Sequence, residues 1–385
     1  MREFAHSGLG GADAPDRQLV AGSGFGGAGR AGLSSLPQRA GRGRLMLPVI
    51  FGLSGACLTA GEQSFFRDAN PAGYILFARN IEHPEQLRAL TDSLRDLAGR
   101  DNLPILIDQE GGRIARLGPP HWRVWPAAAA LAGLSDSPAS TDLDRAIARV
   151  QCNYEALGLE LAAMGINVTC APVLDVPQPD AHDIIGDRAF ARTPEAVAAL
   201  GRACLAGLQV AGVAGVIKHI PGHGRALSDS HESLPRVTAS ESDLVADCAP
   251  FIALADATMA MTAHVIYEAW DPGHCASVST RVIPEQIRGR MGFGGLLISD
   301  DLDMKALSGD IPARAAAVLA AGCDIALNCW GRLDDMKGIA EEVPVMTAEA
   351  TERLARACAP LRVAQTSSAL DARIDALVAR RESLA

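Results

Sequence analysis

The sequence predicts an α/β protein built on a single (β/α)8 barrel of the TIM type. Short apolar runs alternate with longer segments rich in alanine and leucine, and eight such runs follow one another along the chain. Continuous apolar runs of about four to eight residues are typical of parallel strands that are buried on both faces. Several runs also end in clusters of polar residues, as strands of a catalytic barrel do. A doubly wound open sheet would show the same alternation and stays as the alternative at this point.

The eight apolar runs predict the strands in chain order. They are Leu47–Gly52, Tyr74–Phe77, Ile105–Ile107, Asn167–Cys170, Gly215–Ile220, Met259–His264, Gly294–Ser299 and Asp324–Asn328. Four intervening segments have helix-forming composition and the length of a crossover, namely Pro84–Ala98, Asp142–Met164, Pro194–Ala211 and Ile311–Ala321. Residues 334–385 predict amphipathic closing helices, and they are too few for a second domain.

The first 45 residues differ in composition from the rest of the chain. They hold 11 of the 38 glycines, six arginines and three acidic residues, and they show no sustained periodicity. We expect residues 1–45 to form a disordered extension, or to result from a start site placed too early, with Met46 as the true start. The barrel and its closing helices then occupy residues 46–385.

A secretory signal is a competing interpretation of the region around residue 45. Arg39, Arg42 and Arg44 precede the apolar stretch Leu45–Gly61, which resembles the charged and apolar regions of such a signal. Pro48 and three glycines interrupt that stretch, so we expect a cytoplasmic protein. No apolar run approaches the ~18 residues of a membrane span, and no membrane partner is expected.

Charge and cysteine content exclude several classes of function. Among the 385 residues, 45 acidic side chains against 35 basic ones give a formal charge of −10, which disfavours a nucleic-acid partner. The nine cysteines have no Cys-x-x-Cys spacing and are expected to be small buried residues in a reducing compartment. No glycine-rich phosphate motif follows an early strand, so no nucleotide cofactor is expected. We expect a monomer that acts on a small molecule.

Polar clusters follow four of the eight predicted strands. The third strand leads into Asp108–Arg113 and Arg116, and the fifth leads into Lys218–Gly224 and then Ser228–Glu232. The sixth ends at His264 and the seventh in Ser299–Met304. Because the carboxyl ends of barrel strands meet at one mouth, these carboxylates, imidazoles and cations predict an enzyme site.

Each of these clusters also has a structural interpretation. Asp108 could cap the turn after its strand. His219 and His223 could be core or loop histidines with structural hydrogen bonds. Asp301 is expected to belong to a solvated acidic turn, whereas Asp300 directly follows an apolar run and is expected at the barrel rim.

The motifs in these clusters closely resemble those of glycoside hydrolase family 3. They are Asp-Gln-Glu-Gly-Gly-Arg (108–113), Lys-His-Ile-Pro-Gly-His-Gly (218–224), Asp-Ser-His (229–231) and Ser-Asp-Asp-Leu-Asp-Met-Lys (299–305). The likeness is to the single-domain bacterial β-N-acetylhexosaminidase branch, which acts in peptidoglycan recycling. It extends over roughly residues 46–335, and stretches 73–80, 167–176 and 185–190 support it. Several motifs that agree in order and spacing are more specific than any one alone.

The resemblance implies a retaining exo-β-N-acetylglucosaminidase that removes terminal β-linked GlcNAc from muropeptides (GlcNAc-1,6-anhydroMurNAc-peptides). By the same resemblance, Asp300 is the nucleophile that forms a covalent glycosyl-enzyme. His231 is the acid/base, and Asp229 is its partner. A histidine suits this role because its ordinary pKa of about 6.5 lets it donate and accept a proton near neutrality.

The resemblance also implies a set of sugar-binding residues and no cofactor or metal. The binding set is Asp108, Arg116, Arg188, Lys218 and His219. Glu110, Arg113, Asp175 and His223 are expected to brace the site. The aromatic segment 117–126 could stack on a sugar or pack its own side chains, and packing is favoured.

The sequence leaves three other functions as alternatives. A phosphorylase could use the same scaffold, because a histidine in place of an anionic acid/base would not repel phosphate. A metal-dependent hydrolase could draw its ligands from His219, His223, His231 and His264, with Asp229 or Asp300. A barrel that only binds sugar would require Asp300 to be dispensable.

Overall fold

The computed structural model of the protein describes residues 45–133, 140–179, 183–228, 233–364 and 366–384. The predicted extension at residues 1–45 lies outside this part of the chain, apart from Leu45. The acid/base candidates Asp229 and His231 also lie outside the described residues.

Eight parallel strands close into a barrel, which confirms the predicted fold. In chain order they are β1 (Leu47–Gly52), β2 (Pro71–Leu76), β3 (Ile105–Ile107), β4 (Val168–Thr169), β5 (Ala214–Ile220), β7 (Met259–Thr262), β9 (Leu296–Asp301) and β10 (Ile325–Asn328). The first strand, β1, pairs with both β2 and β10, so the open-sheet alternative is wrong. Outside the barrel, β6 (Arg236–Val237) pairs with β8 (Ile266–Tyr267).

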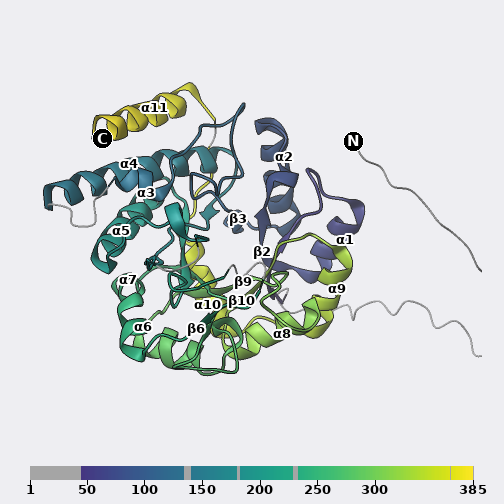
Figure 1. The fold of residues 1–385 in the computed structure, drawn as a ribbon. Helices are drawn as coiled ribbons and strands as arrows, with labels where there is room; N and C mark the ends of the chain where they lie inside the picture. The colour runs from purple at the N-terminus through teal and green to yellow at the C-terminus, as the bar shows by residue number, and fades with distance from the viewer. Residues whose placement is uncertain (1–44, 134–139, 180–182, 229–232, 365, 385) are drawn as a thin grey trace, which may run out of the picture. The chain divides into compact units, whose positions relative to one another are not determined.

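Helices surround the strands on the outside of the barrel, except Ala348–Cys358, which lies in the middle of the ring in Figure 1 and packs against the barrel interior. They are α1 (Ala60–Ala69), α2 (Pro84–Ala98), α3 (Ala128–Ala132), α4 (Ser140–Ala163), α5 (Pro194–Val210), α6 (Glu241–Asp247), α7 (Ala249–Ala253), α8 (Ile311–Ala321), α9 (Leu333–Glu342), α10 (Ala348–Cys358) and α11 (Ser368–Ser383). Short 3-10 helices are η1 (Ala78–Asn80), η2 (Gly186–Arg188) and η3 (Ala276–Val278), and η4 (Val282–Arg290) is a π-helix. The four predicted crossover helices are α2, α4, α5 and α8, with shifts of two residues or fewer at their ends.

The apolar stretch that resembles a signal segment is used by the barrel. All six residues of β1 are buried, and removing the strand would open the barrel between β2 and β10. The end of the stretch enters α1, which the sequence analysis did not predict. This helix starts with a capping box in which Thr59 and Glu62 each bond the other's backbone N–H. Within the described residues, no helix has the length and apolar character needed to cross a membrane.

Alternate residues of each strand belong to two different parts of the core. Ile50, Ile75 and Leu106 pack in a cluster inside the barrel that also holds apolar residues of α10, whereas Phe51 and Tyr74 pack in the larger cluster with the surrounding helices. Side chains of successive strand residues point to opposite faces, so both faces need apolar residues. This explains why the strands are continuous apolar runs in the sequence.

The C-terminal helix α11 lies beside α4 (Figure 1). Arg373 in α11 forms an ion pair of 2.6 Å with Glu155 in α4, and Arg381 donates to Asn153 at 3.0 Å. Eight of the nine cysteines are buried, as expected, and Cys57 is the exposed exception.

Candidate active site

One pocket at the carboxyl ends of the barrel strands gathers most of the polar residues singled out in the sequence. Asp108 follows β3 and Asp300 lies in β9, and these strands are four positions apart in either direction around the closed barrel. Their carboxylates therefore enter the pocket from opposite walls. The pocket is lined by Ile75, Phe77, Asp108, Glu110, Ile114, Arg116, Ile184, Ile185, Arg188, Lys218, His219, His223, Met261, Asp300, Asp301, Leu327 and Cys329.

Asp108 holds two of the predicted binding residues around its carboxylate. The Nη2 of Arg116 lies 3.0 Å from one oxygen, and Nζ of Lys218 lies 3.4 Å from the other. The structural interpretation of Asp108 as a turn cap does not account for these contacts, which join it to the strand β5. The group presents one carboxylate and two cations to the same space, and these groups can accept from and donate to sugar hydroxyls.

Glu110 forms a deeply buried ionic contact in the pocket. Its Oε1 lies 2.6 Å from Nζ of Lys218, and Arg188 donates to both of its oxygens at 2.8 and 2.9 Å. Burial opposes ionisation of Glu110, but the attraction of Lys218 and Arg188 outweighs it and lowers the pKa to about 2. Burial likewise opposes the charge of Lys218, whose pKa is nevertheless raised by Glu110 and Asp108. This cluster keeps its charges throughout the neutral range.

Two neighbouring histidines are held by a single buried carboxylate. Asp175 lies 2.7 Å from Nδ1 of His219, and its other oxygen accepts the backbone N–H of His219 at 3.2 Å and of His223 at 2.6 Å. With Nδ1 so engaged, Nε2 is the nitrogen with which His219 can meet a ligand. Burial lowers the pKa of His223 to about 4, with the neighbouring His219 as a further cause, so His223 is neutral near pH 7.

Asp300 and its neighbour Asp301 end the strand β9. The carboxylate of Asp300 accepts the backbone N–H of Asp301 at 2.8 Å. The prediction that Asp301 belongs to a solvated turn is wrong. Its carboxylate accepts backbone N–H groups of Asp303 and Cys329, both at 3.2 Å, and it lines the pocket. Burial, followed by the charges of Asp303 and Asp300, raises the pKa of Asp301 to about 7.

The turn after β3 carries Arg116 back to Asp108. Gly111 and Gly112 have φ angles of 99° and 57°, and a Cβ at Gly111 would lie 2.3 Å from the carbonyl oxygen of Pro126. The side chain of Gln109 accepts the N–H of Arg116 at 2.8 Å and of Leu117 at 3.0 Å. Gln109 thus holds the loop that carries Arg116, and this contact could not be predicted from the sequence, because nothing local shows that its amide bonds the returning loop.

Arg113 braces this region from outside the pocket, as expected. Its guanidinium donates to the carbonyl oxygens of Asp183 and Ile184 and pairs with Asp187 at 3.1 Å. The segment so held continues into η2, which positions Arg188. The predicted acid/base residues belong to the segment after His223 and Arg225, where the described chain stops at Ser228 and resumes at Ser233.

Comparison with known protein families gives a match over most of the chain. Residues 53–359 match the family described as Glycosyl hydrolase family 3 N terminal domain. The protein belongs to glycosyl hydrolase family 3. It is therefore a glycoside hydrolase, and the resemblance seen in its motifs is confirmed.

Curated family 3 relatives are similar along most of their length. A protein named Beta-hexosaminidase from Alkalilimnicola ehrlichii is 43% identical over 292 residues, which is 74% of this chain and 81% of the relative. Another with the same name, from Pseudomonas aeruginosa, is 39% identical over 295 residues, or 76% of this chain and 83% of the relative. The native structure of NagZ from Neisseria gonorrhoeae has a TM-score of 0.76 and 33% identity, covering 89% of this chain and 98% of that one.

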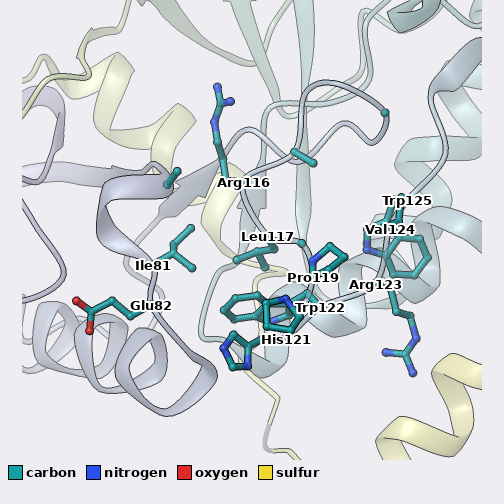
Figure 2. Close-up of a pocket in the computed structure, with 15 residues that line it drawn as sticks. Ile81, Glu82, Arg116, Leu117, Pro119, His121, Trp122, Arg123, Val124 and Trp125 are labelled. Atoms are coloured by element: carbon teal, nitrogen blue, oxygen red, sulfur yellow. The ribbon is translucent and has the colours of Figure 1, made fainter.

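The aromatic loop of this family 3 protein has two parts with different environments (Figure 2). Trp125 is buried and its Nε1 donates to Glu160 at 3.0 Å, which confirms packing for this side chain. The rings of His121 and Trp122 stand edge to face with their centroids 5.6 Å apart, and they line a second cavity that Trp125 and Arg116 also border. That cavity is larger than the pocket lined by Asp108 and Asp300, about 430 Å³ against about 160 Å³. Size alone therefore does not identify the site, since Asp108 and Asp300 line the smaller pocket.

Metal ligation was one of the open alternatives for this family 3 protein. Among the residues that the structure describes, no three or more His, Cys, Asp and Glu side chains are grouped as metal ligands. His264, one of the proposed ligands, uses Nδ1 at 2.7 Å from Ser277 Oγ and Nε2 at 3.1 Å from the Asp301 carbonyl oxygen.

Proposed function

We propose that the protein is a retaining exo-β-N-acetylglucosaminidase. It removes terminal β-linked GlcNAc from muropeptides, the GlcNAc-1,6-anhydroMurNAc-peptides of cell-wall recycling, and it acts as a cytoplasmic monomer. The names of the curated relatives, both Beta-hexosaminidase, support the hexosamine specificity. The muropeptide substrate and the compartment rest on the motif resemblance.

The position of Asp300 is the observation that carries this proposal. It lies at the carboxyl end of a barrel strand, where barrel enzymes place catalytic groups, and it faces a pocket whose opposite wall is polar. An ionised carboxylate there can attack the anomeric carbon of a sugar held across the barrel. The bond from C1 to the leaving oxygen breaks as the bond from C1 to Asp300 forms, and water later hydrolyses the glycosyl-enzyme.

The other sides of the pocket supply the binding groups. Hydrogen-bond acceptors and donors are already fixed there by ion pairs, and they are Asp108, Arg116, Lys218, Arg188 and His219. Glu110 holds two of them, so little side-chain freedom is lost when a sugar binds. Such prior order favours an orientation in which C1 meets Asp300.

The acid/base role falls to His231 with Asp229. Of the carboxylates that line the pocket among described residues, Asp108 and Glu110 are paired with cations, and Glu110 has a pKa of about 2. A carboxyl with so low a pKa cannot donate a proton near neutrality. Asp301 follows the nucleophile on its own strand and binds backbone N–H groups. The segment 229–231 follows the pocket residues of β5 in the chain, and a histidine there can donate to the leaving oxygen.

Hydrolysis of aryl N-acetyl-β-glucosaminides and aryl β-glucosides by the wild type, Asp300→Ala and His231→Ala tests this proposal. We expect a strong preference for the N-acetyl substrate and a loss of at least about 10³-fold in kcat for Asp300→Ala. His231→Ala should lose activity most with poor leaving groups, because good ones depart without a proton. Normal turnover by Asp300→Ala would contradict the proposal.

The same assay separates a hydrolase from a phosphorylase. Added inorganic phosphate should leave the product as free N-acetylglucosamine. Formation of the sugar 1-phosphate would instead assign the phosphorylase activity. Hydrolysis of a GlcNAc-1,6-anhydroMurNAc-peptide, followed by mass spectrometry, tests the natural substrate.

A further inference from the structure

We propose that His264 is a positioning residue for the nucleophile. Its imidazole fixes the carbonyl group of Asp301, and the N–H of Asp301 in turn holds the Asp300 carboxylate in its attacking orientation. The inference rests on the proposed function, in which Asp300 attacks the sugar, and assigns a role to a histidine outside the catalytic and sugar-binding sets.

His264 lies just beyond β7, the barrel neighbour of β9, and its side chain is buried. Its Nε2 lies 3.1 Å from the carbonyl oxygen of Asp301. A carbonyl oxygen only accepts hydrogen bonds, so Nε2 carries a proton and donates it. On the other side of the ring, Nδ1 lies 2.7 Å from Ser277 Oγ, which in turn lies 2.6 Å from Thr262 Oγ1. The ring is therefore oriented from both sides.

Asp301 transmits this contact to the nucleophile. Its N–H donates to Oδ1 of Asp300 at 2.8 Å, and its own carboxylate accepts N–H groups of Asp303 and Cys329. The N–H, the carbonyl and the carboxylate of Asp301 are thus all engaged. Contacts from β7, β9 and β10 meet at this one residue, next to the group that must point at the anomeric carbon.

The end of the strand ladder explains why a side chain is needed here. Registered pairing of β7 with β9 stops at Met261 and Ile298, whereas β9 continues to Asp301. Beyond that point, the His264 imidazole takes over from the backbone of β7 as the hydrogen-bonding group toward β9. A misplacement of about 1 Å at a reacting group can cost about 10²-fold in rate, so this contact bears on catalysis.

The test uses a probe that needs the nucleophile but not the acid. In a 5-fluoro-N-acetylglucosaminyl fluoride, the Asp300 carboxylate bonds to C1 while fluoride leaves without a proton, and the glycosyl-enzyme accumulates. Mass spectrometry of peptides gives the labelled residue and the labelling rate. His264→Ala removes the contact, and His264→Gln keeps an N–H donor at similar reach. Thr91→Val is the matched control, since it removes a buried hydroxyl that donates to the Met164 carbonyl at 2.9 Å, far along the chain from the site.

We expect His264→Ala to label Asp300 and turn over substrate about 10- to 100-fold more slowly, with KM changed by less than about threefold. His264→Gln should recover most of the lost rate, and Thr91→Val should label like the wild type. Labelling of His264→Ala at the wild-type rate would overturn the inference. Equal loss in the Ala and Gln variants would also overturn it, because packing rather than the N–H would then matter.

The outcomes separate this inference from the proposed function. If the wild type is not labelled at Asp300, the assignment of the nucleophile fails. If Asp300 is labelled normally in every His264 variant, only the positioning role fails. Should His264→Ala not fold, as judged by circular dichroism, Ser277→Ala decides together with His264→Gln. It frees the ring at Nδ1 and is expected to slow labelling, and a wild-type rate there would contradict the inference.

Discussion

The Nζ of Lys218 lies 2.6 Å from Oε1 of Glu110, and both side chains are buried at the carboxyl end of the barrel. Arg188 closes the other side of Glu110 through two further hydrogen bonds. A buried carboxylate so paired is costly to break, because removal of one partner leaves unpaired buried charge. The contact joins β3 to β5 and sets the position of two proposed sugar-binding cations.

Glu110→Gln should therefore destabilise the protein in a pH-dependent way. The folded pKa of about 2 lies below the ordinary 4.5, so ionisation of Glu110 contributes stability above about pH 4.5 and loses it as pH falls toward 2. The difference of about 2.5 pKa units corresponds to about 3 kcal/mol at pH 7. Urea unfolding of the wild type and Glu110→Gln from pH 7 to pH 3.5 measures this effect. The difference between their free energies of unfolding should become smaller below pH 4.5.

Glu241→Gln is the control for this comparison. It breaks an ion pair with Arg290 of the same length, 2.6 Å, in which both side chains are well exposed. Exposed pairs contribute little, so its effect should be small at every pH. A Glu110→Gln effect as small as that of Glu241→Gln would contradict the assigned role of Glu110.

Asp301→Asn is expected to stabilise the protein, whereas Glu110→Gln is expected to destabilise it. The folded pKa of Asp301, about 7, lies above the ordinary 3.8, so the native state keeps a proton that the unfolded chain has lost. Stability from this group is complete below about pH 3.8 and is lost as pH rises to about 7. The Asn variant has no charge to bury, so it should gain stability relative to the wild type, by up to about 4 kcal/mol above pH 7.

Unfolding free energies of the wild type and Asp301→Asn between pH 4 and pH 8 measure this effect. The difference in unfolding free energy between the two proteins should grow with pH and become constant above pH 7. Asp334→Asn is the control, because the Asp334 side chain is fully exposed and its replacement should leave the curve unchanged. A difference that is constant with pH would show that Asp301 titrates normally.

The strands could be predicted from sequence because their burial on both faces leaves a local mark. Leu47–Gly52 is apolar throughout, the other runs are mostly apolar, and the structure places all eight runs in the barrel. The helix α1 was not predicted, because its start lies in an apolar stretch whose first part also fits a signal segment. Its boundary depends on the single capping box at Thr59.

The site could be predicted only in part. Position at strand ends, together with the motif resemblance, singled out Asp108, Lys218 and Asp300. The environment of Asp301 could not be predicted, because it is made by the N–H of Cys329 and the ring of His264, both distant in sequence. The central place of Glu110 likewise depends on contacts with Lys218 in β5 and Arg188 in η2, both distant in sequence.

Activity should not depend on a bound metal ion. The proposed reaction needs only a carboxylate nucleophile and a proton donor. Dialysis against EDTA, followed by assay in metal-free buffer, should leave kcat and KM for an aryl N-acetyl-β-glucosaminide unchanged. A loss of activity that zinc or another divalent ion restores would instead support the metal-dependent hydrolase.

Trp125 and Trp330 offer a matched pair of Trp→Phe changes with different expected results. Trp125 is buried and its Nε1 donates to Glu160 at 3.0 Å, whereas the side chain of Trp330 is exposed, at 56%. Trp125→Phe removes a hydrogen bond to a charged group, which contributes about 1.5–3 kcal/mol, and leaves Glu160 its ion pair with Arg123 at 3.2 Å. Thermal and urea unfolding should show that loss for Trp125→Phe and almost none for Trp330→Phe, while KM stays the same for Trp125→Phe. A raised KM without a loss of stability would mean that Trp125 contacts substrate, and packing would no longer explain the loop.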